Sequence, residues 1–202
     1  DGSTYDTWTQ DVSIRSPEGG SFQRFGHRVE TNDNGDILAV SSIAPGNAGK
    51  VEIFVRQGSS DGDSTQNTFT HVQTLTGVTS DGSTLNTSFG ESIVMSKDGT
   101  MLLIGATGVD STEVDTGAVY RYKWNADGST NTYTLQQTIN APDKLHNTRF
   151  GSSLALTHDG TRLAISAEQS ANPREMKLDS GQTTFDLQDT RIVDTNEGSG
   201  AV

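Results

Sequence analysis

Histidines and carboxylates are the side chains of this protein that could act as acids, bases or metal ligands. The 202 residues include 26 acidic residues and four histidines, which are His27, His71, His146 and His158. No two histidines have the spacing of a metal-binding pair, so we predict that each lies on the surface. Two carboxylates at a defined separation could hydrolyse a glycosidic bond. In so acidic a chain, chance alone supplies many such pairs.

One turn has the alternating oxygen ligands that Ca²⁺ prefers. Asn32, Asn34 and Asp36 alternate along it. The corresponding turns further along the chain have a single acidic residue each, Asp98 or Asp159, whereas Ca²⁺ takes about six to eight oxygens. We therefore predict hairpin turns without a metal and no resident cofactor, with Ca²⁺ as the alternative. A separate acidic loop could also hold a cation but fixes no ligand geometry; its carboxylates are Asp110, Glu113 and Asp115.

No short catalytic motif is present in the sequence. It has no Gly-x-Ser-x-Gly elbow, no Walker-type phosphate loop and no dinucleotide fingerprint. It also has no cysteine, which excludes disulfides and thiolate metal sites. The net charge of −12 disfavours nucleic acid and anionic membranes as partners. The longest apolar run, Met101–Ala106, is too short to cross a membrane. We therefore predict no catalytic, cofactor-binding or metal-binding residues, and a protein that is not an enzyme.

A repeat determines where these residues lie. The segments FGHRVETNDNGDILAVSS, FGESIVMSKDGTMLLIGA and FGSSLALTHDGTRLAISA start at Phe25, Phe89 and Phe150, 64 and 61 residues apart. Self-similarity at a nearly fixed period indicates a repeat architecture. The fixed places of these aromatic residues in the repeat predict that they pack between neighbouring units rather than bind a sugar.

The residue pattern of each repeat copy predicts a series of short strands. In the second copy, residues 89–96 form a first strand, 97–100 a tight turn and 101–106 an apolar second strand. Asp-Gly or Asn-Gly between two apolar runs favours a hairpin, because these residues tolerate a positive φ. A third strand follows at 117–124, and 49–56 matches it in the first copy.

A fourth strand completes each unit. Three aromatic residues stand six positions before an aliphatic one, and six is an even number, so we predict that both members of each pair point to one face of their strand. The pairs are Trp8 with Ile14, Phe69 with Leu75, and Tyr133 with Ile139.

Four antiparallel strands in tandem are typical of a β-propeller blade. We predict an all-β chain in which residues 1–202 form a partial propeller of about three incomplete-to-complete blades. The units are 1–60, 61–124 and 125–202, the last with a polar insertion at 168–199 that holds one strand pair, 183–187 and 190–193. Residues 200–202 would begin another third strand. A β-sandwich would not repeat at this period. Either a longer polypeptide or several copies would complete the ring.

The Phe-Gly opening, the Ser-x-Asp-Gly-Thr turn at 96–100 and the Gly-Ala that ends the second strand at Gly105-Ala106 together resemble the FG-GAP repeat, which is found in integrin α subunits. The other copies depart from it, with Ser41-Ser42 and Ser166-Ala167 at the last position. The resemblance implies an extracellular or cell-surface propeller, with a virion surface also compatible, that binds ligands or forms assemblies. One glycosylation sequon, at 86–88, is weak support for secretion.

These observations favour a non-enzymatic structural or adhesive module of a larger assembly. Its expected partners are other protein subunits or the rest of its own polypeptide, and glycans, with no nucleic acid and no membrane insertion. Two alternatives stay open. One is an enzyme that acts on polysaccharide on a propeller scaffold, and the other is a Ca²⁺-dependent, integrin-like ligand-binding domain.

Overall fold

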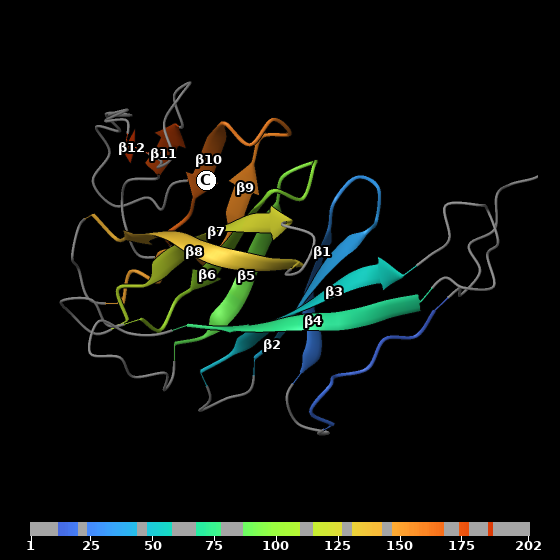
Figure 1. Cartoon of the computed structure of the whole chain (residues 1–202). Helices are drawn as coiled ribbons and strands as arrows, with labels where there is room; N and C mark the ends of the chain where they lie inside the picture. Colours follow the sequence, from blue (N-terminus) through green and yellow to red (C-terminus); the bar gives the residue numbers. More distant parts are fainter. Residues whose placement is uncertain are drawn as a thin grey trace, which may run out of the picture.

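The computed structural model is built from three antiparallel sheets of four strands each (Figure 1). It describes residues 12–19, 24–43, 48–57, 68–77, 87–109, 115–126, 131–142, 147–167, 174–177 and 186–187. Within these ranges there is no helix, and hence none long and apolar enough to cross a membrane. The predicted all-β class and the four-stranded units are confirmed.

Each sheet is a simple meander in which consecutive strands are neighbours. The first sheet contains β1 (Phe25–Thr31), β2 (Ile37–Ser42), β3 (Lys50–Gln57) and β4 (Thr68–Thr76). The second contains β5 (Phe89–Met95), β6 (Met101–Ala106), β7 (Ala118–Ala126) and β8 (Asn131–Asn140). The third contains β9 (Leu154–Leu156), β10 (Arg162–Ile165), β11 (Arg174–Lys177) and β12 (Asp186–Leu187).

The structure departs from the predicted strands at the two ends of the chain. The third sheet takes its third and fourth strands from 174–177 and 186–187, inside the expected polar insertion. Residues 190–193 and 200–202 lie outside the described residues. Near the start of the chain, residues 12–14 form no strand, and Trp8 lies outside the described ranges.

The hairpin turn between the first and second strands of each sheet depends on a glycine. Gly35, Gly99 and Gly160 have φ values of 68°, 72° and 71°. This left-handed region is open to glycine but costs other residues free energy because of their Cβ atom. The three predicted Asn-Gly and Asp-Gly turns are therefore confirmed.

The second sheet is apolar on both faces because it lies between the other two. A larger core cluster fills the space between the first and second sheets, and its most buried members include Ile53, Phe89, Leu102 and Ile104. A smaller core cluster lies between the second and third sheets, where Leu103, Val119, Phe150 and Leu163 are buried. Because both faces of β6 are buried, apolar and polar residues do not alternate along it.

A β-bulge overturns the prediction that the aromatic and aliphatic residues of the fourth strand share a face. The ladder between β7 and β8 shifts register between Arg121 and Tyr122. One extra residue in β8 inverts the side-chain alternation beyond it. Tyr133 therefore packs in the larger cluster and Ile139 in the smaller one, on the opposite face. A single strand thus serves both cores.

Gln73 joins the fourth strands of the first two sheets. Its side-chain amide donates to the Tyr133 carbonyl at 2.9 Å and accepts from the Tyr133 amide at 2.7 Å. The Tyr133 hydroxyl, inside the core, donates to the Gly99 carbonyl at 2.7 Å. Burial raises the pKa of the Tyr133 phenol well above its ordinary value, so the hydroxyl keeps its proton and stays a hydrogen-bond donor at neutral pH.

The Phe-Gly pair of each later sheet docks on the glycine that precedes the third strand of the sheet before it. The Phe89 amide donates to the Ala48 carbonyl at 2.9 Å, and the Thr87 hydroxyl donates to the same oxygen. Gly49 follows with φ 75°, and a Cβ there would lie 2.3 Å from the Phe89 carbonyl oxygen. The next interface repeats this arrangement: Phe150 and Thr148 donate to the Thr116 carbonyl, and Gly117 makes the close approach.

The glycine of the Phe-Gly pair is also pressed against the preceding sheet in the second and third sheets. Gly90 and Gly151 have φ 93° and 90°, and a Cβ on them would lie 2.7 Å and 3.0 Å from atoms of the sheet before. Gly26 has the same φ, 90°, but nothing lies within 4 Å of its Cβ position. The Phe-Gly motif is therefore a packing device between sheets.

Alanine at position 90 should be much more destabilising than alanine at position 26. In both variants a Cβ at positive φ lowers the free energy of unfolding by about 1–2 kcal/mol. Gly90→Ala also forces its Cβ against Ser41, which lowers it by about a further 1–3 kcal/mol. Urea unfolding of dilute protein measures both losses in the free energy of unfolding. Equal losses would contradict the inter-sheet contact.

Candidate functional site

Polar side chains gather where the first strands of neighbouring sheets lie beside each other. The strands β1, β5 and β9 are edge strands of their sheets. Contact between the first and second sheets is most extensive at β1 and β5, and β5 also contacts β9. We call this region the first-strand edge. It collects one turn with a left-handed residue from each sheet.

The backbone at the first-strand edge is shaped by a left-handed residue before each Phe-Gly pair. Arg24, Ser88 and Arg149 have φ values of 47°, 50° and 49°. The ladders of β1 and β5 then shift register just after the pair. Such bulges change the direction of side chains and are frequent at active sites. Hydrogen bonds of 3.0–3.1 Å close the turns and join His27 to Arg24, Glu91 to Ser88 and Ser152 to Arg149.

His27 and Glu91 occupy the same position of two adjacent copies and face each other. The His27 Nε2 atom lies 3.7 Å from the Glu91 Oε1 atom, and each side chain is 23% exposed. The exposed Arg28 side chain donates from Nε to the Glu91 carbonyl at 3.0 Å and from Nη1 to the His27 carbonyl at 3.4 Å. Backbone carbonyls thus hold a guanidinium beside the histidine–carboxylate pair.

The three side chains are of the types that general acid–base chemistry uses. An imidazole accepts a proton from water, and a neighbouring carboxylate stabilises the positive charge that results. The guanidinium presents N–H donors that suit a developing oxyanion or a carboxylate. His27, Glu91 and Arg28 therefore combine a base, its stabilising charge and an anion-binding group.

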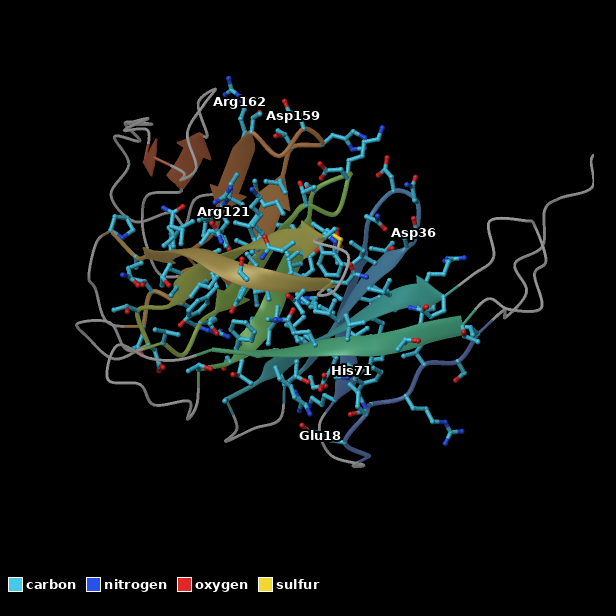
Figure 2. The ribbon with its side chains drawn as sticks, in the orientation of Figure 1. Glu18, Asp36, His71, Arg121, Asp159 and Arg162 are labelled. Carbon is cyan, nitrogen blue, oxygen red and sulfur yellow. The ribbon has the colours of Figure 1, made fainter. Side chains whose placement is uncertain are left out.

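A second polar cluster is buried within the first sheet. The Glu52 carboxylate is fully buried and accepts from His71 Nε2 at 2.7 Å and from Thr74 Oγ1 at 2.6 Å. Lys50 Nζ lies 3.1 Å from its other oxygen and also pairs with Glu18. Figure 2 shows Glu18 and His71 on one side of β4, far from Asp159 and Arg162. Burial opposes the charge of Lys50, but its two carboxylate partners outweigh burial and raise its pKa.

The Glu52 cluster occupies a packing position of the repeat. Glu52 and Lys50 correspond to Tyr120 and Ala118 of the second sheet, which pack in the larger core cluster. The charges on Glu52 are therefore compensated by its own sheet, as a buried carboxylate requires. We assign this cluster a structural role.

The acidic hairpin turns use their carboxylates internally. Asp98 accepts from Ser96 Oγ at 2.7 Å and from the Thr100 amide at 3.0 Å. Partial burial opposes the ionised form of Asp98, but these hydrogen bonds outweigh it and lower the pKa. In the third sheet, Thr157 and Thr161 hydrogen-bond to Asp159 in the same way and lower its pKa to about 2.

In the first-copy turn, for which Ca²⁺ is the alternative to a metal-free hairpin, the side-chain acceptor is Asn32. Its side-chain oxygen accepts from the amides of Asp36 and Ile37 at 2.8 and 3.1 Å. In the described part of the chain, no three histidine or acidic residues come together as a metal site would require. Asp110 and Glu113 lie outside the described residues. The Ca²⁺ alternative stays a prediction.

Three of the four histidines contact a carboxylate, which the sequence did not indicate. His27 faces Glu91, His71 binds Glu52, and His158 lies 3.5 Å from Asp33. His146 lies outside the described residues. A signal existed for the first pair, since His27 and Glu91 both stand two positions after a repeat phenylalanine. The repeat shows that the two positions are equivalent, and the stacking of the sheets brings them together.

No protein-family model and no curated protein matches this chain. Solved structures do resemble it. A candidate 6-phosphogluconolactonase from Bacteroides uniformis ATCC 8492 matches 80% of the chain with a TM-score of 0.54 and 14% identity. A second candidate 6-phosphogluconolactonase, from Bacteroides fragilis NCTC 9343, matches 79% with a TM-score of 0.52 and 14% identity. The chain spans less than two fifths of these proteins, 38% and 36% of their lengths.

The comparisons correct the sequence-based assignment. The FG-GAP, integrin-like interpretation is wrong, because no family model matches and the similar structures are described as lactonases. The expectations of a non-enzymatic adhesive module and of no enzyme are overturned on the same ground. The physical reason is that the Phe-Gly motif serves the packing of one sheet against the next. Proteins with unrelated functions can share this packing requirement.

Removal of the Glu52 carboxylate should strongly destabilise the first sheet. Glu52→Ala leaves Lys50, His71 and Thr74 without their shared partner, and loss of one member of a buried ion pair costs about 3–5 kcal/mol. Thr74→Val removes a single hydrogen bond and should cost about 1 kcal/mol. Urea unfolding compares the two variants. A loss below that of Thr74→Val would show that the network is not stabilising.

The stability contributed by Asp98 should be lost in acid. Its folded-state pKa lies below the ordinary 3.8, so the contribution is full above that value and disappears as the pH falls through the lower folded value. Asp98→Ala should therefore unfold more easily than the parent protein at neutral pH, by about 1–2 kcal/mol, and approach it near pH 2. Thermal unfolding across this pH range measures the difference, with exposed Asp36→Ala as the control. A constant difference would contradict the assignment.

Proposed function

We propose that this chain forms part of a β-propeller and that the protein hydrolyses a sugar-derived lactone at the first-strand edge. The observation that carries the proposal is the pair of His27 and Glu91, beside Arg28, at the place where contact between the first two sheets is most extensive. The fold likeness to two candidate 6-phosphogluconolactonases supports the same reaction class.

The sheet arrangement supports the propeller. Three meanders follow one another in the chain and stack face to face through the same Phe-Gly contact. Contact between the first two sheets is most extensive at the first strands, as expected of blades whose first strands surround a common axis. In the similar structures the matched region covers about two fifths of the length, which leaves room for further blades.

Lactone hydrolysis suits the three side chains. The oxygen of a water molecule attacks the lactone carbonyl carbon while His27 takes a proton from that water. Glu91 stabilises the imidazolium that forms. Arg28 donates hydrogen bonds to the tetrahedral oxyanion. The ring carbon–oxygen bond then breaks, and the leaving alkoxide takes the proton from His27. The product is a hydroxy acid, whose carboxylate also suits the guanidinium.

The test measures lactone opening by the purified full chain. Gluconolactone and 6-phosphogluconolactone are supplied separately, and acid release is followed above the uncatalysed rate. His27→Gln should lower kcat about 10²- to 10⁴-fold, because the general base is lost. Arg28→Gln should lower kcat/KM by removing an oxyanion donor.

His158→Gln is the matched control. His158 is 69% exposed and pairs with Asp33 at the hairpin turns, so this change removes a histidine–carboxylate contact elsewhere. Its rate should equal that of the parent protein. No rate above the uncatalysed reaction, or equal losses in the His27 and His158 variants, would overturn the proposal.

A further inference from the structure

The row of equivalent repeat positions that contains His27 and Glu91 has a third member, Ser152. Each of the three residues stands two positions after a repeat phenylalanine. All three side chains are partly exposed, as groups that contact a ligand must be. Ser152 is not among the three side chains of the candidate site, so its place beside that site needs an account of its own.

The backbone directs these three side chains in the same way. The residue before each phenylalanine has φ 47°, 50° or 49°, and the glycine after it has φ 90°, 93° or 90°. The amides of His27, Glu91 and Ser152 then donate to the carbonyl three residues earlier, at 3.0, 3.1 and 3.1 Å. The three turns share one local geometry, and their side chains therefore leave the backbone in equivalent directions.

The docking of one sheet on the next is also the same at both interfaces. At Gly49 and at Gly117 a Cβ would lie 2.3 Å from the carbonyl oxygen of the phenylalanine that docks there. Across the first interface, the His27 Nε2 and Glu91 Oε1 atoms are 3.7 Å apart. The same docking at the second interface, where β5 contacts β9, places the position of Ser152 next to that of Glu91.

Ser166, which follows β10, holds the Ser152 hydroxyl. Their Oγ atoms are 2.8 Å apart, and the Ser166 Oγ atom also accepts from the Ser153 amide at 2.8 Å. In the first sheet Ser41 accepts from the Arg28 amide in the same manner, at 3.0 Å, so this cap belongs to the fold. The contact with Ser152 is additional, and it fixes the direction of the Ser152 hydroxyl.

The Ser152 hydroxyl keeps hydrogen-bonding capacity for a ligand whichever serine is the donor of this pair. A hydroxyl has one donor and two acceptor positions. If Ser152 donates to Ser166, the acceptor positions of its oxygen remain for a ligand. If Ser166 donates, the Ser152 proton remains. A sugar hydroxyl can pair with either form, because it both donates and accepts.

We propose that Ser152 is a specificity-determining residue that hydrogen-bonds a ring hydroxyl of the lactone, and that Ser166 positions it. This inference rests on the hydrolysis proposed above. A polar group that is built to pair with a hydroxyl is left without that partner when the ligand lacks one, which weakens binding of such a ligand. The site therefore favours lactones that carry ring hydroxyls.

The experiment compares gluconolactone with δ-valerolactone, which has the same ring without hydroxyls. Hydrolysis of each is measured above its uncatalysed rate. Ser152→Ala should lower kcat/KM for gluconolactone about 2- to 10-fold, as expected for the loss of one neutral hydrogen bond, and leave kcat/KM for δ-valerolactone unchanged. The change in the ratio of the two values is the readout, because general damage to the site would lower both values together.

Three further variants define the role of each serine. Ser152→Thr keeps a hydroxyl and should keep the ratio of the parent protein. Ser166→Ala removes the group that holds Ser152 and should lower the ratio by less than Ser152→Ala does. Ser153→Ala is the matched control, because Ser153 is exposed and contacts Ser166 through its backbone. It should behave like the parent protein.

The outcomes separate this inference from the proposed activity. A Ser152→Ala protein that loses the same factor for both lactones, or loses nothing, would overturn the hydroxyl contact and leave the hydrolysis intact. If neither lactone is opened, the proposed function is wrong, and calorimetry then measures binding of the two product acids, gluconate and hydroxyvalerate. Weaker binding of gluconate alone to Ser152→Ala would support the contact. Equal binding of gluconate by parent and variant, or no binding, would reject it.

Discussion

The approach of a Phe-Gly turn to the glycine before the preceding third strand is the contact on which the rest of the structure depends. At Gly49 and Gly117 the backbones come so close that a Cβ would lie 2.3 Å from a carbonyl oxygen. No side chain can occupy that space, and the amide of the phenylalanine satisfies a carbonyl of the other sheet at the same point. Sheet spacing is therefore set by backbone contact, and the core side chains fill what is left.

The same contact explains where polar side chains of adjacent sheets meet. A residue held at positive φ before each phenylalanine, followed by a bulge, turns the next side chains away from the ladder. Two equivalent positions then meet across the interface, as His27 and Glu91 do. A motif that serves packing thus also brings residues of adjacent sheets together, which allows the docking geometry to persist while the side chains beside it vary.

Much of the fold could be predicted from the sequence, because the hairpin turns and the strands between them are local. Gly35, Gly99 and Gly160 mark turns by their own conformational freedom, and β6 matches its predicted bounds. The faces of Tyr133 and Ile139 could not be predicted, since a single extra residue in β8 inverts the alternation. The family was also misassigned, because residues selected for docking carry no information about the reaction.

The candidate site was missed for a different reason. His27 and Glu91 are 64 positions apart, and only the stacking of sheets places them together. Glu52 is fully buried, where it contacts the adjacent strand and Lys50. Such pairings depend on register and on the order of sheets, which a single sequence specifies only indirectly.

The amide of Gln73 has a consequence for solubility. The outer edge of β8 would otherwise present the N–H and C=O groups of Tyr133 to solvent, and such exposed edges recruit strands from other molecules. Gln73 satisfies both groups with one side chain, as a neighbouring strand would. This acidic chain, with its three described sheets of four strands, thus blocks part of an aggregation-prone edge with a side chain of its own, without adding a fifth strand.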